Sequence, residues 1–242
     1  MILEELALFL TSQQKRELSD KLARIPSREL TGETIEKTLA EVLQDARQLP
    51  KDKRWFDIVQ PTKGMEVKTF VARPPLRVGT TVYNVLKRVS KVDTRDAKGN
   101  LRNAQQVGDE VIDYLHGTIR EHAALKKVPD THLLSILFRT EDARSYAYWE
   151  EPLHFGQKSS YTWVWKGQET LTGYRGNEAI FQWYSRNQKQ LFYRWKIPTA
   201  ADFFQVKPVQ TVTLTKEEFE NERRKSYLEG FRNGKSGKPS RL

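Results

Sequence analysis

The sequence predicts an α/β protein with a mixed central β-sheet flanked by helices, together with N-terminal helices and an antiparallel, aromatic-rich β region. Three observations predict this class. Residues 31–49 repeat apolar side chains at helical spacing, and the segment HLLSILF at 132–138 is typical of a strand covered on both faces. From 146 to 204, aromatic residues alternate with polar ones between turn residues, as in antiparallel strands.

Helices are expected to fill the first fifty residues. Ser12 is expected to cap the second helix, which ends before Pro26, and Thr31 to cap the third, which runs to Leu49. Apolar stripes define the three helices: Leu3, Leu6 and Leu10, then Leu18, Leu22 and Ile25, then Ile35, Leu39, Val42 and Leu43.

A β-hairpin should follow these helices. Its arms are expected near residues 55–60 and 65–71, and its loop at 61–64 holds Pro61 and Gly64, which supply turn geometry. The charged residues 91–102 predict a loop, residues 107–125 a helix, and 132–138 a central strand. Between the hairpin and the loop at 91–102 we expect another helix over 78–89, because Val78, Val82, Val85, Leu86 and Val89 recur at helical spacing.

The C-terminal part should contain a second hairpin and a final helix. Residues 181–184 and 191–195 are predicted to be strands joined by the turn at 185–189. Thr215 and Glu218 form a capping box that should open a helix to about residue 231. The tail beyond it is rich in Gly, Ser and Lys.

The charge of the chain favours a polyanionic partner. The formal net charge is +10, and nucleic acid is the first candidate because each neutralised phosphate releases condensed counterions. The absence of Cys excludes disulfides and thiolate zinc sites, and the four His residues have no metal-ligand spacing. No apolar run reaches membrane length and the first ten residues carry acids, so we expect a cytoplasmic protein.

The first hairpin carries an arrangement of charge that can bind metal. If residues 61–64 form the loop, Gln60 pairs with Met65 and Asp57 faces Lys68, so that Asp57, Glu66 and Lys68 share one sheet face. Two carboxylates so placed can share Mg²⁺, which prefers oxygen ligands and keeps waters that a phosphate can replace. A slip of one residue would scatter the three side chains over both faces.

An ordinary surface salt bridge is the alternative explanation. Acids and lysines on adjacent strands often form exposed pairs worth about 0 to 1 kcal/mol and without function. The spacing D-x8-E-x-K of Asp57, Glu66 and Lys68 also recurs by chance in charged sequences.

The helix at 31–49, the hairpin with its D-x8-E-x-K spacing and the buried strand beyond resemble the PD-(D/E)XK nuclease superfamily, especially compact type II restriction endonucleases. The resemblance covers mainly residues 31–89 and implies a restriction-endonuclease-like core. It implies that Asp57 and Glu66 are the metal-binding acids and Lys68 the catalytic lysine. It also implies a glutamate on the preceding helix, for which Glu36 is the candidate and Glu33 and Glu41 are rivals. Phe56 stands where the motif often has proline.

By this resemblance the chain is a Mg²⁺-dependent, sequence-specific endonuclease of double-stranded DNA, acting as a homodimer on a palindrome. A single nuclease domain over 1–242 would comprise an N-terminal helical appendage (1–30), a catalytic core (31–140), a β-rich DNA-recognition region (141–214) and a C-terminal helix with a basic tail (215–242). Two alternatives remain open: a repair or transposon-end nuclease of the same superfamily, and a non-catalytic DNA-binding or regulatory protein.

DNA contacts are expected from basic and amide residues around the site and in the β region. A helix presenting Lys87, Arg88 and Lys91 would follow a phosphate backbone, and the tip 186–189 would project from its hairpin. The tryptophans of the β region are expected to be core, and His132 a structural histidine. The full set of predicted DNA-binding residues is Arg73, Arg77, Lys87, Arg88, Lys166, Arg175, Arg186, Asn187, Gln188, Lys189 and Arg194.

Overall fold

The structure is a computed structural model that describes residues 10–43, 45–49, 55–186 and 189–207. The chain divides into two compact units, Met1–Pro208 and Val209–Leu242, and the second lies outside the described residues. The predicted helix opening at Thr215, the basic tail and the first predicted helix up to residue 9 therefore also lie outside them. Among the helices in the described ranges, none combines the length and apolar character that crossing a membrane requires.

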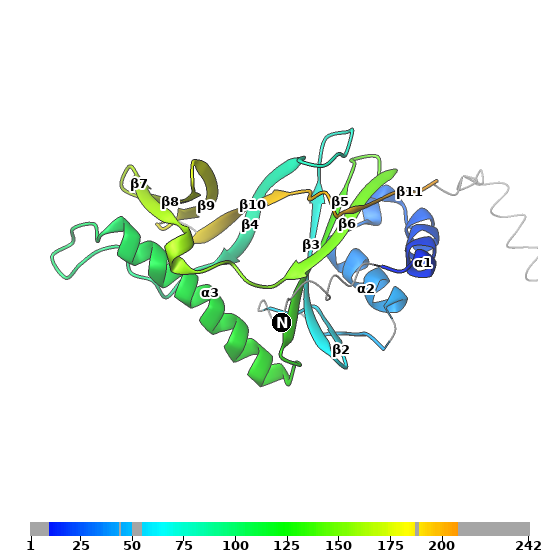
Figure 1. Cartoon of the computed structure of the whole chain (residues 1–242), viewed down its shortest axis with the longest axis horizontal. Helices are drawn as coiled ribbons and strands as arrows, with labels where there is room; N and C mark the ends of the chain where they lie inside the picture. Colours follow the sequence, from blue (N-terminus) through cyan, green and yellow to red (C-terminus); the bar gives the residue numbers. More distant parts are fainter. Residues whose placement is uncertain (1–9, 44, 50–54, 187–188, 208–242) are drawn as a thin grey trace, which may run out of the picture. The chain divides into compact units, whose positions relative to one another are not determined.

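A six-stranded mixed sheet forms the centre of the first unit, which confirms the predicted α/β class (Figure 1). The order is β1-β2-β3-β5-β6-β11, with β3 and β5 parallel and every other pair antiparallel. The predicted central strand is β5, whose side chains are buried on both faces. The bounds are β1 (Arg47–Gln48), β2 (Ile58–Gln60), β3 (Lys63–Val71), β5 (Thr131–Arg139), β6 (Ser145–Pro152) and β11 (Asp202–Gln205).

Two N-terminal helices cover one face of this sheet. α1 (Ser12–Ala23) is capped by Thr11 through a capping box with Gln14, one residue before the predicted cap. α2 (Gly32–Val42) has the predicted cap, Thr31, but ends at Val42 rather than Leu49. The apolar faces of both helices pack with β3, β5 and β6 in one core cluster, and a short 3₁₀ helix, η2 (Ser27–Glu29), connects them.

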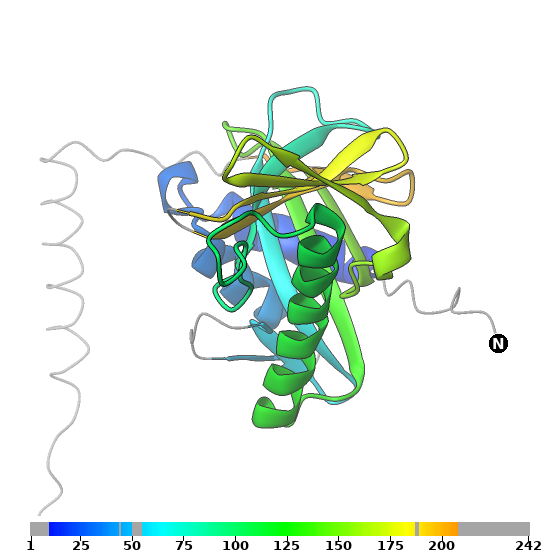
Figure 2. The same cartoon turned by 90° about the vertical axis from the view of Figure 1, so that its left-hand side faces the viewer.

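A second, five-stranded sheet is antiparallel throughout and has the order β4-β10-β9-β8-β7. The long helix α3 (Ala104–Lys126) packs against β7 and β8, next to the 3₁₀ helix η3 (Lys158–Ser160) (Figure 2). The antiparallel strands predicted for 146–204 are thereby confirmed. The bounds are β4 (Thr81–Arg88), β7 (Thr162–Lys166), β8 (Thr170–Arg175), β9 (Glu178–Tyr184) and β10 (Gln190–Lys196).

The helix predicted over 78–89 is wrong, because this segment forms β4 at an edge of the second sheet. A bulge in the β4–β10 ladder explains the misleading spacing. Leu191 pairs with Lys87 and Phe192 with Val85, so Leu86 is an extra residue that breaks the strand alternation. The many β-branched side chains of the segment favour a strand and were the better signal.

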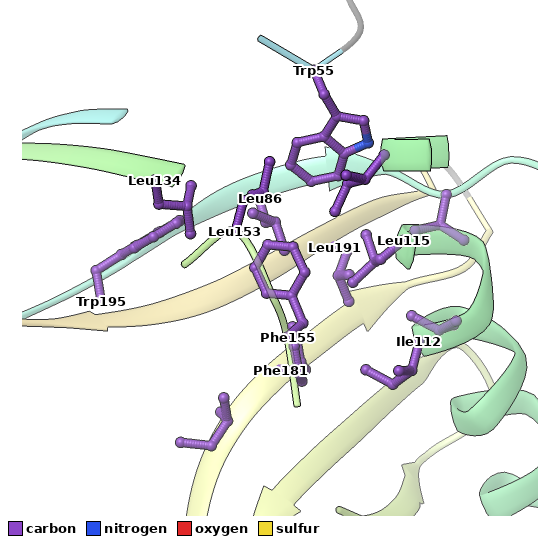
Figure 3. Packing of buried hydrophobic residues seen from close by; sticks show 14 of the residues in the cluster. Trp55, Leu86, Ile112, Leu115, Leu134, Leu153, Phe155, Phe181, Leu191 and Trp195 are labelled. Carbon is purple, nitrogen blue, oxygen red and sulfur yellow. The ribbon is translucent and has the colours of Figure 1, made fainter. Parts of the chain in front are cut away.

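The main core lies between the two sheets and α3 (Figure 3). Trp55, Leu134 and Phe155 meet residues of the second sheet there, such as Trp195 and Phe181. Three of the four tryptophans predicted to lie in the core are buried there: Trp163, Trp183 and Trp195 are at most 3% exposed. The fourth, Trp165, is half-buried and packs against the same cluster.

Contact between α3 and β7 depends on a glycine. A Cβ on Gly108 would lie 2.1 Å from Cγ of Trp163, inside the ring of a buried side chain. We expect Gly108→Ala to lower the free energy of unfolding by about 1–3 kcal/mol or more, because the helix must move off the sheet. On the same helix, a Cβ on Gly117 meets nothing within 4 Å, so Gly117→Ala should instead stabilise by about 0.5–1 kcal/mol. Urea unfolding of both variants measures this difference, and equal effects would contradict it.

Candidate active site

The hairpin that carries the predicted site is tighter than the sequence suggested. β2 and β3 are joined by a two-residue turn at Pro61 and Thr62, and Gln60 pairs with Lys63 instead of Met65. The register is therefore shifted by two residues from the predicted one. Because strand side chains alternate with a period of two, a shift of two leaves the paired residues on their predicted faces. Asp57 lies just before β2, and its own hydrogen bonds place it beside β3.

Gly64 lies in β3 and not in the turn, which corrects its predicted role. A Cβ at this position would lie 2.9 Å from Cδ1 of Phe56 and 2.1 Å from Cγ1 of Val128. Glycine is needed here for space, because its lack of a side chain lets the Phe56 ring and Val128, which follows α3, pack directly against β3.

Asp57 stands where the two strands separate. Its N–H donates to the carbonyl of Met65 at 2.8 Å, and its carboxylate Oδ2 accepts the N–H of Val67, also at 2.8 Å. The side chain thus takes over the hydrogen bond that a longer β2 would have made to β3. This bond fixes the Asp57 carboxylate beside the backbone that carries Glu66 and Lys68.

Glu66 links the two arms of the hairpin. Its side chain is buried, accepts the N–H of Phe56 at 3.1 Å through Oε2, and meets Nζ of Lys68 at 2.5 Å through Oε1. The predicted juxtaposition of Asp57, Glu66 and Lys68 is therefore present in the fold.

Phe56 precedes Asp57 and donates its N–H to Glu66. It stands where the PD-(D/E)XK motif that the hairpin resembles often has proline. Its φ of 67° is one that a proline ring cannot adopt, so the absence of proline follows from the backbone. A positive φ is costly for an aromatic residue and persists where packing enforces it. The Phe56 ring packs against His122 and His132, at centroid distances of 5.5 and 4.9 Å, which also gives His132 the predicted structural role.

The electrostatics of the site favour added positive charge. Burial, together with the neighbouring Glu66 carboxylate, raises the pKa of Asp57 to about 7, although the Val67 N–H opposes the change. Burial lowers the pKa of Lys68, but Glu66, Asp57 and Glu36 outweigh it, and the net pKa of the lysine is raised. Lys68 therefore carries its proton at neutral pH, and acidic groups outnumber it in the cluster.

Glu36 is the helical glutamate that joins this cluster. The amino end of α2 lies beside β3, since a Cβ on Gly32 would be 3.6 Å from Oγ1 of Thr69. From there the half-buried Glu36 raises the pKa of both Asp57 and Lys68. Of its rivals, Glu41 pairs with Lys21 at 2.9 Å, and Glu33 is exposed.

The donor set suits a hard cation that keeps much of its hydration. Asp57 and Glu66 offer oxygen ligands at a point of excess negative charge, as Mg²⁺ requires. In the ranges that the structure describes, no group of three or more His, Asp or Glu side chains is set to hold a metal. Water or substrate phosphate would therefore complete the coordination of a cation bound by the two acids.

The predicted DNA-binding residues separate into different places. Arg73 and Arg77 come together in the β3–β4 loop, where they line a cavity of about 650 Å³. Lys166 and Arg194 lie on strands of the second sheet. Arg175 is turned to the Tyr161 ring and donates to its hydroxyl at 2.5 Å.

The predicted helix with Lys87, Arg88 and Lys91 does not exist, because the first two lie on β4 and Lys91 follows it in a loop. Nζ of Lys87 lies 4.4 Å from the centroid of the Trp55 ring, whereas Arg88 is exposed. These cations therefore do not form the continuous phosphate-binding ridge that a helix would have offered.

The tip of the second hairpin is described only at its ends. Arg186 is exposed and pairs with Glu169, and Nζ of Lys189 donates to the Ser90 carbonyl at 3.1 Å. Asn187 and Gln188 lie outside the described residues.

Sequence reasoning missed Phe56 as the residue that positions Glu66, and no local pattern announces a positive φ at a phenylalanine. It also missed Tyr83, an exposed ring on β4, because residues 78–89 were assigned to a helix. The β-branched and aromatic residues of TTVYNV at 80–85 were the signal available.

Comparisons of the chain with protein-family models, curated proteins and solved structures found no match. Fold and site together define a mixed α/β protein that carries a carboxylate–lysine cluster on a central hairpin.

Proposed function

We propose that the protein is a metal-dependent nuclease that hydrolyses phosphodiester bonds of double-stranded DNA, with a restriction-endonuclease-like core. The observation that carries this proposal is the cluster around the buried Glu66. In it Asp57 accepts a hydrogen bond from Val67 and Glu66 forms an ion pair with Lys68. The raised pKa of Asp57 shows that a further positive charge beside it would be favourable. An exposed salt bridge is a poor description of it, since Glu66 is only 2% exposed.

The order of elements supports the same assignment. α2 precedes the β2–β3 hairpin, α3 follows it in sequence, and β5 lies parallel to β3 at the centre of the sheet. The helix before the hairpin and the buried parallel strand agree with the resemblance to the PD-(D/E)XK superfamily. The helix expected directly after the Lys68 strand, over 78–89, does not, because that segment is β4 and the next helix, α3, comes later in the chain.

Each side chain then has a distinct task. A Mg²⁺ ion held by Asp57 and Glu66 would polarise the scissile phosphate and lower the pKa of a bound water. Burial and the neighbouring Glu66 carboxylate raise the pKa of Asp57, and a bound cation would favour its ionised form. Lys68 keeps its proton, so it orients the water and offsets charge in the transition state rather than acting as a general base. Glu36 adds negative charge from α2.

Type II behaviour is included in the proposal: a cytoplasmic homodimer that cuts both strands of a palindromic site. A two-fold protein fits a two-fold sequence, and the net charge of +10 favours DNA as partner. The recognised sequence would be read by side chains outside the Asp57–Glu66–Lys68 cluster.

Incubation of plasmid DNA with the protein tests the proposal, first with Mg²⁺ and then with excess EDTA. We expect discrete fragments only with Mg²⁺, and mapping of their ends reports specificity and stagger together. Nicks at single-stranded or branched positions would instead identify the repair-type nuclease. A mobility shift without cleavage would overturn catalysis in favour of a DNA-binding protein.

A further inference from the structure

One face of the second sheet is left open by the described helices. α3 packs on the side that carries Trp163, Trp183 and Trp195, and α1 and α2 belong to the first sheet (Figures 1 and 2). Because strand side chains alternate, Tyr184 and Phe192 point to the opposite side, which we call the outer face.

Three aromatic rings gather on this outer face from three adjacent strands. Tyr83 of β4 stacks on Phe192 of β10, with centroids 5.9 Å apart and planes at 16°, and Tyr184 of β9 meets Phe192 edge-on at 5.4 Å. Tyr83 is 39% exposed and Tyr184 42%. Exposed rings on a rigid sheet offer π surfaces to a ligand.

Cations lie around these rings. Arg194 lies directly across from Tyr83 in the ladder, and the exposed Lys196 lies across from Thr81. Nζ of Lys166 stands 5.7 Å from the ring centroid of Tyr174. Glu178 is the acid that meets this group, at 3.3 Å from Arg194. Rings interleaved with positive charge fit an anionic ligand with flat bases better than a second copy of a basic chain.

The outer face continues into the cavity of the β3–β4 loop. Thr81 lines that cavity and pairs with Lys196, so the cavity opens beside the cations of β10. Arg73 and Arg77 contribute its positive charge, and the loop itself follows directly on β3, the strand of Glu66 and Lys68. Positively charged residues and aromatic rings thus extend from the end of β3 across the outer face of the second sheet.

We propose that the outer face binds single-stranded DNA, with bases stacked on Tyr83, Phe192 and Tyr184 and phosphates held by Arg194, Lys196 and the Arg73–Arg77 cavity. Stacking requires bases that are free of a complementary strand, so the inference favours a substrate that carries an unpaired segment next to its duplex. Binding of a single strand to the outer face does not depend on the proposed function; if that strand belongs to the substrate cut at the Asp57–Glu66–Lys68 site, it favours the repair-type nuclease over type II cleavage of a palindrome.

Wild-type protein in EDTA provides the first test, by fluorescence anisotropy with three labelled probes of equal length. These are oligo(dT), an abasic strand with the same phosphates, and a blunt duplex. We expect oligo(dT) to bind at least tenfold tighter than the abasic strand, since stacking on several rings is lost. Equal affinity for the two would overturn the proposal without any variant.

Paired variants provide the second test. Tyr83→Ala with Tyr184→Ala should weaken oligo(dT) binding about fivefold or more for each ring, and leave abasic binding nearly unchanged. Tyr83→Phe with Tyr184→Phe keeps both rings and should bind like wild type. Arg194→Gln with Lys196→Gln should reduce the salt dependence of binding, whereas Arg144→Gln, which changes an exposed cation in the turn between β5 and β6, should not. Unchanged oligo(dT) affinity in the alanine pair overturns the proposal.

Two further readouts separate the possible failures. If sedimentation shows a wild-type dimer that the alanine pair converts to monomer, the outer face joins two copies of the chain and the proposal is overturned. Asp57→Asn should bind oligo(dT) like wild type, because it leaves the outer face intact. Wild-type protein that binds oligo(dT) preferentially but does not cleave plasmid shows that the proposed function has failed and the outer-face inference stands. Cleavage without preferential oligo(dT) binding shows the reverse.

Discussion

Asp57→Asn, Glu66→Gln and Lys68→Ala should each reduce Mg²⁺-dependent cleavage by about 10²–10³-fold or more, with DNA binding in EDTA largely retained. The first two replace a charged ligand by an amide of similar shape, and the third removes the cation at 2.5 Å from Glu66. Initial rates on a supercoiled plasmid measure the effect. Because groups that act as a unit are not additive, the triple variant should lose little more than the worst single one.

A pair of similar charge outside the site controls for these changes. Lys158 and Asp113 form a surface salt bridge at 2.7 Å, with both side chains about half exposed. Lys158→Ala and Asp113→Asn should cleave at the wild-type rate, because such pairs contribute little to stability. Full activity in any of the three site variants, after thermal melts have shown them folded, would exclude Asp57, Glu66 and Lys68 as the catalytic group.

Unfolding of the metal-free protein should become easier as pH rises from about 4 to about 7. The pKa of Asp57 is raised in the folded state from 3.8 to about 7, so over this range the native state binds a proton that the unfolded state has lost. The stabilisation is complete below pH 4 and lost as pH passes 7, by up to about 4 kcal/mol for three pH units. Saturating Mg²⁺ should oppose the loss above pH 7, because it binds the ionised carboxylate.

Urea unfolding at several pH values, for wild type and Asp57→Asn, isolates this contribution. The amide has no proton to gain, so the slope of stability against pH should be smaller in the variant. Other buried acids, among them Glu150 and Glu151, also have raised pKa values and contribute to both slopes equally. Identical slopes would show that Asp57 carries no such proton.

Short-range pattern was enough to predict much of this fold. The cap at Thr31, the helix over 107–125, the buried strand at 132–138 and the antiparallel strands after 146 are all present, because each rests on local periodicity or turn chemistry. β4 was mistaken for a helix because the bulge at Leu86 changes the spacing of its apolar residues. That bulge depends on pairing with β10, about a hundred residues further along the chain.

The grouping of Asp57, Glu66 and Lys68 was predictable for a related reason. They come from one hairpin, and the register error of two residues leaves the alternation along the strands unchanged. Asp57 itself lies just outside β2 and is placed by its hydrogen bond to Val67. The scattering of the basic residues was not predictable, since it depends on which ring or acid each long side chain meets after folding. Lys87 over Trp55 and Arg175 over Tyr161 are examples.

The parallel ladder between β3 and β5 has a consequence for biosynthesis. It pairs Lys63 with Thr131 and Val71 with Arg139. β3, which carries Glu66 and Lys68, therefore cannot pair with β5 until β4, α3 and β5 itself have been translated. Contacts so distant in sequence slow folding, and a lone two-stranded hairpin is marginal in water. A nascent chain on the ribosome should therefore lack a stably formed Asp57–Glu66–Lys68 cluster until β5 has emerged.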